Sequence, residues 1–251
     1  MALIEENIWL SRSPRVARSR VRLFCFPYAG GGAAIFRRWD ELLPAQIEVW
    51  ALRLPGRELR IHEPPMTDML DLVELIADTI APYCDQPFAL FGHSMGAGIA
   101  YETALELARR HREPMCLMPS ARRAPHVPSR NPSRHLLTDE QFLEELRRLK
   151  GTPSEVLDSP ELMELMLPVL RADFQLADLY VSERRTKLSC PVVAFGGAND
   201  AYVASADIGA WRDVSGPGFI MHMLSGDHFY INNEQRELTA LVARELSCLP
   251  V

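Results

Sequence analysis

Ser94 lies in the segment Gly92-His93-Ser94-Met95-Gly96, which has the pattern Gly-x-Ser-x-Gly. The apolar residues 88–91 before this motif are typical of a buried strand, and the small and apolar residues after it predict a helix to about Arg110. A serine at such a strand-to-helix turn is held in an exposed, strained backbone conformation, where it can act as a nucleophile. Ser94 is therefore the residue most suited to nucleophilic catalysis.

A serine hydroxyl is a weak nucleophile near neutral pH and needs a general base, which a third group orients. Asp200 follows an apolar strand pattern at 191–195, and His228 follows another at 219–224. Both are expected at the sheet edge that carries Ser94. The chain order serine, acid, histidine is that of α/β-hydrolases. We assign His228 as general base and then acid, and Asp200 as its orienting carboxylate.

Other ionisable residues lie close to this set. Asp227 is the alternative acid, but it adjoins His228 in the same loop and is badly placed to reach that ring. His93 should project beneath the turn and pack there. The remaining histidines show no metal-ligand spacing, so we expect no metal; they are His62, His111, His126, His135 and His222.

An acyl-transfer site also needs two backbone N–H groups that converge on the developing oxyanion. One should belong to Met95, the residue after the nucleophile. The other should come from the turn 28–32, where we predict Ala29, with Gly30 as the alternative. That turn lacks the Gly-Lys-Ser/Thr ending and the Gly-x-Gly-x-x-Gly spacing of nucleotide-binding loops, so no nucleotide cofactor is expected.

Strand and helix patterns alternate along most of the chain, which predicts a mostly parallel sheet with helices on both faces. The fold class is thus α/β, of the α/β-hydrolase type. Strand patterns occur at 21–26, 47–52, 88–91, 115–118, 191–195 and 219–224, and helical patterns at 35–43, 69–80, 95–110, 207–211 and 234–249.

The alternation stops between residues 123 and 187, which we interpret as a helical lid inserted into a core made of residues 1–122 and 188–251. Thr138 and Thr152 each open a capping-box pattern. A third helix should begin at Ser159, be interrupted at Pro168 and end near Tyr180. The alternative is that these helices belong to the core. Four apolar residues of the third helix are expected to contact an acyl chain: Met163, Met166, Leu170 and Phe174.

Composition limits the remaining classes. A length of 251 residues suits one α/β domain with an insertion, and 47% apolar and 24% charged residues are ordinary for a globular protein. A net charge of −6 argues against nucleic acid as a partner. Residues 1–20 do not read as a secretory signal, and no apolar run is long enough to cross a bilayer. Five widely spaced cysteines indicate reduced thiols in a cytoplasmic protein.

Several stretches together resemble one family, the type II (external) thioesterases that accompany polyketide and non-ribosomal peptide synthases. The resemblance spans residues 20–245 and implies hydrolysis of stalled acyl groups from the phosphopantetheine arm of acyl or peptidyl carrier proteins, with Ser94, Asp200 and His228 as catalytic residues. One departure is the segment 118–121, where the family would have a strand ending in Ser-Gly. The matching stretches are 26–31, 54–58, 91–97, 122–125, 167–174 and 226–229.

The segment 119–137 contains four arginines and no acid within an acidic protein, which favours it as the docking surface for an acidic carrier protein. We expect a monomer. The alternative functions are a medium-chain fatty acyl thioesterase, a small-molecule carboxylesterase, and a hydrolase fold used for binding alone. The four predicted docking residues are Arg122, Arg123, Arg130 and Arg134.

Overall fold

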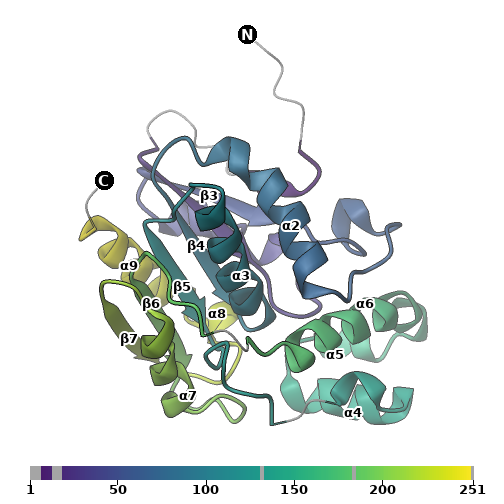
Figure 1. Cartoon of the computed structure of the whole chain (residues 1–251). Coiled ribbons are helices and arrows are strands. Elements are labelled where there is room, and N and C mark those ends of the chain that lie inside the picture. Colours follow the sequence, from purple (N-terminus) through teal and green to yellow (C-terminus); the bar gives the residue numbers. More distant parts are fainter. Residues whose placement is uncertain (1–6, 13–18, 131–132, 183–184, 250–251) are drawn as a thin grey trace.

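The computed structural model describes residues 7–12, 19–130, 133–182 and 185–249, so part of the N-terminal segment considered above lies outside the described residues. Seven strands form one sheet in the order β1-β3-β2-β4-β5-β6-β7 (Figure 1). All neighbours are parallel except β1, which pairs antiparallel with β3 at the edge. The strands are β1 Leu10–Arg12, β2 Val21–Phe26, β3 Ile47–Leu52, β4 Phe88–His93, β5 Cys116–Ser120, β6 Val192–Gly197 and β7 Phe219–Leu224.

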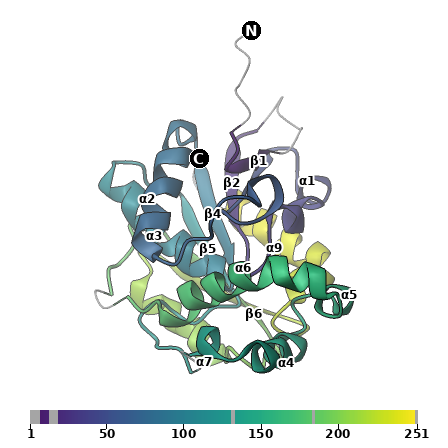
Figure 2. The same ribbon diagram turned by 90° about the vertical axis from the view of Figure 1, so that its right-hand side faces the viewer.

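Helices cover both faces of the sheet, because alternate strand residues point to opposite sides and both sides are apolar. On β2, Phe24 and Phe26 belong to the core under α2, α3 and α7, whereas Leu23 and Cys25 belong to the core under α1, α8 and α9. Figure 2 shows α2 and α3 on one side of the strands and α1 and α9 on the other. These helices are α1 Trp39–Leu42, α2 Met69–Ile80, α3 Met95–Arg109, α7 Ser205–Gly209, α8 Tyr230–Asn233 and α9 Gln235–Ser247.

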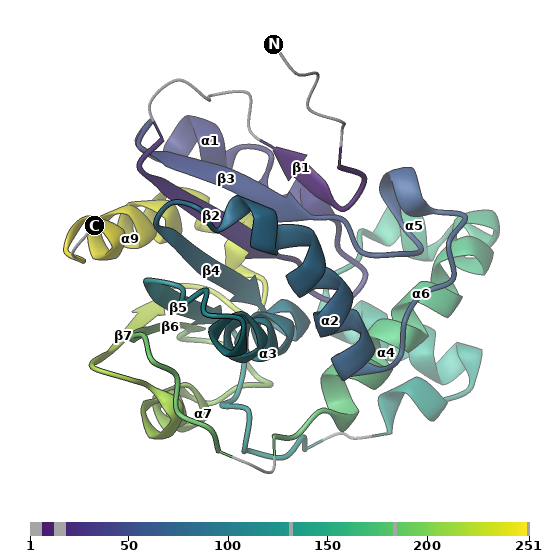
Figure 3. The ribbon, with the colours of Figure 1, turned by 45° about the horizontal axis from the view of Figure 1, so that its top comes forward.

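Three further helices, α4 Asp139–Leu149, α5 Ser154–Leu157 and α6 Pro160–Leu179, lie between β5 and β6 in the chain. We call residues 123–187 the insertion. Figure 3 shows its helices grouped beyond one end of the sheet, apart from the helices that cover its faces. The insertion has a small apolar core of its own, formed by Phe142, Leu146, Leu149, Leu157, Met163, Leu170 and Phe174.

Of the helix boundaries predicted within the insertion, some agree with the structure and others do not. The predicted capping box of Thr138 opens α4: its hydroxyl accepts from the Gln141 N–H, and the Gln141 side chain accepts from the Thr138 N–H. The box predicted at Thr152 is wrong, because α5 is a single turn with Pro153 at its N-cap and no side-chain cap. The predicted interruption at Pro168 is also wrong. Pro168 lies on the exposed side of a continuous α6, where solvent can satisfy the carbonyl that loses its partner.

Two other segments differ from expectation in the described chain. The helix predicted over 35–43 is split into a 3₁₀ turn, Ala33–Phe36, and the one-turn α1. Tertiary packing decides this, because Phe36 and Trp39 are both buried edge-on against Phe91. Strand β1 was not predicted, since three residues are too short to show alternation.

None of the helices in the described ranges is long and apolar enough to cross a membrane. All five cysteines are unpaired, and four of them are buried.

Candidate active site

Ser94 lies at the turn between β4 and α3 with φ 52° and ψ −115°, a conformation that residues other than glycine rarely adopt. The two glycines of the motif permit this turn. A Cβ at Gly92 would come within 2.2 Å of the Gly96 carbonyl oxygen, and a Cβ at Gly96 within 2.2 Å of the Phe26 carbonyl oxygen on β2. The sharp turn therefore depends on close backbone contact, and it presents the Ser94 hydroxyl above the sheet.

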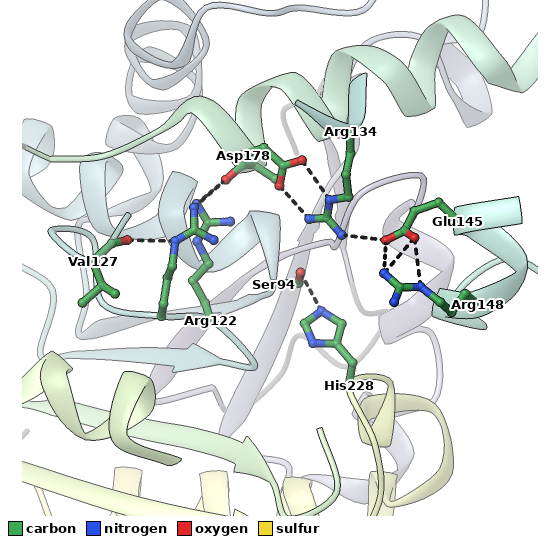
Figure 4. Close-up of polar contacts among 10 residues, drawn as sticks. Ser94, Arg122, Val127, Arg134, Glu145, Arg148, Asp178 and His228 are labelled. Carbon is green, nitrogen blue, oxygen red and sulfur yellow. Dashed lines mark hydrogen bonds and ion pairs between the residues drawn. The ribbon is translucent and has the colours of Figure 1, made fainter. Parts of the chain in front are cut away.

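The structure brings Ser94, His228 and Asp200 into one hydrogen-bonded line. His228 Nε2 lies 2.9 Å from Ser94 Oγ, and His228 Nδ1 lies 2.7 Å from Asp200 Oδ2 (Figure 4 shows the first pair). A carboxylate can only accept, so we assign the ring proton to Nδ1, which leaves Nε2 free to accept the serine proton. This arrangement can generate a serine alkoxide and later return the proton to a leaving group.

The Asp200 carboxylate is held on both oxygens. Its Oδ1 accepts from the N–H groups of Tyr202 and Val203, at 2.8 and 3.1 Å. Burial raises its pKa, but the hydrogen bonds from His228 and these two N–H groups outweigh that effect and lower it overall. Asp227 is exposed and accepts from the Phe229 N–H, so it does not contact the His228 ring.

His93 is buried beneath the turn, and it does more there than fill space. Its Nε2 lies 2.9 Å from the His228 carbonyl oxygen, so it donates and steadies the backbone of His228. Its Nδ1 accepts from the Ser120 hydroxyl at 2.8 Å, and that hydroxyl in turn contacts the Tyr230 hydroxyl at 2.5 Å. Sequence patterns missed Ser120 and Tyr230, because only the fold brings β5 and α8 to this point.

We expect stability to fall in mild acid because His93 is buried neutral. Burial, with the nearby His228 adding to it, lowers the pKa of His93 to about 3, whereas an imidazole in an unfolded chain titrates near 6.5. Between these values only the unfolded chain takes up the proton, so the free energy of unfolding decreases as pH falls through this window. The expected contribution is roughly 2 kcal/mol between pH 7 and pH 5.

Urea unfolding at pH 7, 6 and 5 measures this effect. His93→Gln should flatten the pH dependence, whereas His62→Gln, at an exposed histidine, should keep the wild-type slope. A wild-type slope in His93→Gln would contradict the assignment of a neutral His93.

The predicted oxyanion donors differ in availability. Met95 is the first residue of α3, so its N–H has no acceptor within the helix. Ala29 lines the same pocket as Ser94, and its N–H donates to no described residue. The alternative, Gly30, is already engaged, because its N–H donates to Asp173 Oδ2 at 2.7 Å. The structure thus favours Ala29 over Gly30.

Ser94 and His228 open into a pocket between the sheet and the insertion. Its walls come from the turns after β2, β4, β5, β6 and β7 and from α4 and α6 of the insertion, which therefore covers the carboxyl ends of the strands. Much of the wall is apolar and suits an acyl chain. The apolar and aromatic lining residues include Val127, Leu149, Phe174, Ala177, Tyr202 and Phe229.

Of the four residues predicted to contact an acyl chain, only Phe174 lines this pocket. Met163 and Leu170 are buried in the core of the insertion, and Met166 packs against that core. Met163, Met166 and Leu170 are needed there because the helices of the insertion require apolar contacts with one another before they can form a cover.

The predicted docking arginines are mostly not available to a partner. Arg122 is buried and donates to the Ala177 carbonyl at 2.7 Å; burial, then the nearby Arg123, lower its pKa to about 9. A docking role for Arg122 is therefore wrong. Arg134 is fixed by two bonds to Asp178, at 2.6 and 2.9 Å, and lies 3.7 Å from Glu145 (Figure 4).

Arg123 is partly buried and donates to the Val127 carbonyl, which leaves Arg130 as the one exposed member of the predicted four. The acid Asp178, which pairs with Arg134, is wholly buried, and a sequence pattern cannot show this.

The departure noted at 118–121 has a local cost. Ala121 follows β5 with φ 49°, in the left-handed region that glycine would adopt without strain. Ala121 lines the pocket and its N–H donates to the Phe195 carbonyl on β6, while the neighbouring Ser120 carbonyl accepts from the Ser94 N–H at 2.8 Å.

A family model described as "Thioesterase domain" matches residues 21–245. The chain belongs to this thioesterase family. It is 41% identical over 241 residues to gramicidin S biosynthesis protein GrsT of Aneurinibacillus migulanus, covering 96% of this chain and 94% of GrsT. It is 36% identical over 222 residues to the medium-chain S-acyl fatty acid synthase thioesterase of Rattus norvegicus, covering 86% and 83%.

A solved structure of YbtT, a type II thioesterase from the yersiniabactin NRPS/PKS biosynthetic pathway, superposes with a TM-score of 0.86. The two sequences are 30% identical, and the match covers 94% of this chain and 97% of YbtT. The chain is therefore a thioester hydrolase of the α/β-hydrolase fold, as its motifs predicted.

Proposed function

We propose that this thioesterase removes acyl groups from the phosphopantetheine arm of acyl or peptidyl carrier proteins and so clears stalled polyketide or non-ribosomal peptide synthases. The observation that carries the proposal is the line from Ser94 through His228 to Asp200 at the floor of a pocket that the insertion covers. The similarity to GrsT and YbtT supports the choice of substrate class.

The proposed reaction passes through an ester of Ser94. His228 Nε2 takes the Ser94 proton as Oγ attacks the thioester carbon, and the N–H groups of Ala29 and Met95 hold the oxyanion. Collapse of this intermediate breaks the C–S bond, and the pantetheine thiolate receives the proton from His228. His228 then deprotonates a water that attacks the acyl ester, and Ser94 recovers its proton as the carboxylic acid leaves.

Residues 123–187 act in this proposal as a lid over a core of residues 1–122 and 188–251. The apolar wall that includes Phe174 holds the acyl chain. Met163, Met166 and Leu170 support that wall from within the insertion rather than touching substrate.

The carrier protein is proposed to dock beside a second hollow that shares His228 with the catalytic pocket. Three exposed cations line it, Arg130, Arg148 and Lys150, and we call them the basic rim. The phosphodiester of the arm is anionic, so a basic rim at the mouth of the pocket complements it. The rim retains Arg130 from the predicted docking set. Arg130 pairs with Asp207 at 2.9 Å and Arg148 pairs with Glu145 at 2.8 Å, but their side chains stay 64% and 63% exposed, so both can still face a partner.

Removing two charges of the basic rim should impair only the carrier-bound substrate. Arg130→Gln with Lys150→Gln should raise KM for an acyl-carrier protein several-fold and flatten its salt dependence, because exposed charges act on encounter. Turnover of a short acyl-pantetheine thioester should be unchanged. Steady-state kinetics on both substrates at two salt concentrations measure this.

The matched control is Arg37→Gln with Arg38→Gln, which removes the same charge from an exposed site beside α1. Equal losses on both substrates, or equal losses in the control, would contradict docking at the basic rim.

The similarity to the rat enzyme favours one second candidate, release of medium-chain acyl groups from a fatty acid synthase. A panel of acyl groups on a modular-synthase carrier, on a fatty acid synthase carrier and as an oxygen ester separates the candidates. The proposal expects the highest kcat/KM on the modular carrier. A preference for medium chains on the fatty acid carrier would favour the second candidate, and a preference for the oxygen ester would favour an esterase.

A monomeric state and a cytoplasmic location complete the proposal. Five unpaired cysteines, four of them buried, support a reducing compartment. Light scattering of the purified chain tests the oligomeric state.

A further inference from the structure

Two stretches that marked the family resemblance are 54–58, which has no role so far, and 167–174, of which only Leu170 and Phe174 have been given one, in the pocket wall. The structure joins them through Arg57 and Asp173, which form two parallel bonds: Nη1 to Oδ2 at 2.6 Å and Nη2 to Oδ1 at 2.8 Å. Both side chains are buried, with 9% and 2% of their surfaces exposed. Neither residue lines the catalytic pocket.

This ion pair forms hydrogen bonds with the turn at 28–32, which carries the proposed oxyanion donor Ala29. Asp173 Oδ2 also accepts from the Gly30 N–H at 2.7 Å, and Arg57 Nη1 also donates to the Gly31 carbonyl at 3.1 Å. The first and third peptide groups after Ala29 are thus held, one by Asp173 and the other by Arg57. The orientation of the Ala29 N–H depends on these peptides, because they set the course of the turn.

Packing around the Arg57–Asp173 pair also holds the turn at 28–32 in place. Gly30 has φ 77°, and a Cβ there would come within 2.5 Å of Leu170 Cδ2, so α6 lies directly on the turn. Glu58, next to Arg57, accepts from the Ala34 N–H at 3.0 Å. The stretch 54–58 therefore holds the turn from the core, and α6 holds it from the insertion.

A buried ion pair is weak evidence for stability, since desolvation of the two charges offsets much of their attraction. Here every bond of the Asp173 carboxylate goes either to Arg57 or to the turn, which indicates that orientation is its task. The insertion has separate anchors to the core, because Arg122 donates to the Ala177 carbonyl and the Tyr180 hydroxyl donates to Glu102 on α3.

We propose that Arg57 and Asp173 are positioning residues that assemble the oxyanion hole when α6 is seated on the turn at 28–32. The pair aligns the Ala29 N–H, and because Asp173 belongs to the insertion, closure of the insertion completes the hole. The inference rests on the proposed roles of Ser94 and Ala29. It assigns to the insertion a part in catalysis beyond covering the pocket.

The variants Asp173→Asn and the double variant Arg57→Gln/Asp173→Asn test this. With a short acyl-pantetheine thioester, kcat should fall about 10- to 100-fold with KM unchanged, since loss of one aligned donor costs up to about 10³ in rate. The single variant leaves Arg57 buried without its counter-ion. If it fails to fold, the double variant, which buries no unpaired charge, carries the same test.

An oxyanion-specific readout separates positioning from general damage. An acyl trifluoromethyl ketone forms an oxyanion adduct with Ser94, so its affinity should fall about 10- to 100-fold in the folded variants, as kcat does. A thioether analogue of the substrate forms no oxyanion and should bind as to the wild type. The matched control is Asp178→Asn, which removes another buried, doubly bonded carboxylate of α6 that does not touch the turn.

The expected result is a loss of kcat and ketone affinity in the Asp173 variants, with Asp178→Asn within threefold of wild type. Unchanged kcat in the folded double variant, or an equal loss in Asp178→Asn, would overturn the proposal. Labelling of wild-type Ser94 with a fluorophosphonate distinguishes a failure of the proposed function from a failure of the positioning role. Failure to label would sink the proposed function itself, whereas labelling together with unaffected Asp173 variants sinks only the positioning role.

Discussion

Ser94→Ala should abolish turnover while the fold stays intact. Without Oγ no acyl-enzyme forms, and loss of a triad nucleophile typically removes on the order of 10⁶ in kcat. The residual rate should reflect only binding and the oxyanion donors acting on water. Alanine is smaller than serine and removes no structural side-chain bond of Ser94, because its hydroxyl bonds only His228 among the described residues.

Hydrolysis of an acyl-pantetheine thioester, followed by thiol release, measures the loss, and circular dichroism checks the fold. Ser225→Ala, at an exposed serine in the turn before His228, is the control and should remain near wild-type activity. If Ser94→Ala kept more than about a tenth of the wild-type rate, another group would have to be the nucleophile.

Asp200→Asn should lower kcat by about 10⁴, the loss seen when the acid of such a triad becomes an amide. The structure gives a specific reason. The N–H groups of Tyr202 and Val203 require an acceptor at the Oδ1 position, so an asparagine would place its carbonyl oxygen there. Its NH₂ would then face His228 Nδ1, which would have to accept, and the ring proton would move to Nε2. His228 could no longer take the Ser94 proton.

Asp227→Asn serves as the control, because Asp227 adjoins His228 in sequence but its carboxylate accepts, among the described residues, from the Phe229 N–H and not from the His228 ring. Its kcat should stay within a few-fold of wild type. A large loss in Asp227→Asn together with a small loss in Asp200→Asn would exchange the roles of the two acids.

Much of the fold was predictable because it rests on local patterns. The limits predicted for β2, β3, α2 and β7 coincide with the structure, since each strand is a nearly continuous apolar run, the apolar residues of α2 recur with helical spacing, and Asp68 caps α2. The segment around Pro168 was not predictable in this way. An interior proline removes one backbone hydrogen bond and usually breaks a helix, but α6 continues through Pro168, which lies at the surface where water can satisfy the freed carbonyl.

The candidate site could be predicted from local patterns. These patterns are the serine motif, the Gly-rich turn, and the acid and histidine that follow later strands. All of them lie at strand ends, and the ends of parallel strands meet at one edge of the sheet. The sequence by itself thus determined the fold class, the family and the candidate triad of Ser94, Asp200 and His228.

Only the tertiary structure decided which charges are available and which are engaged. Arg122 and Arg130 lie in the same arginine-rich loop, yet one is buried against Ala177 and the other faces solvent. The sequence around Asp173 shows only a polar residue on a helix. The structure places its carboxylate against Arg57 and the Gly30 N–H. A charged side chain is buried only where distant segments supply partners for it, and the local sequence pattern contains no information about those partners.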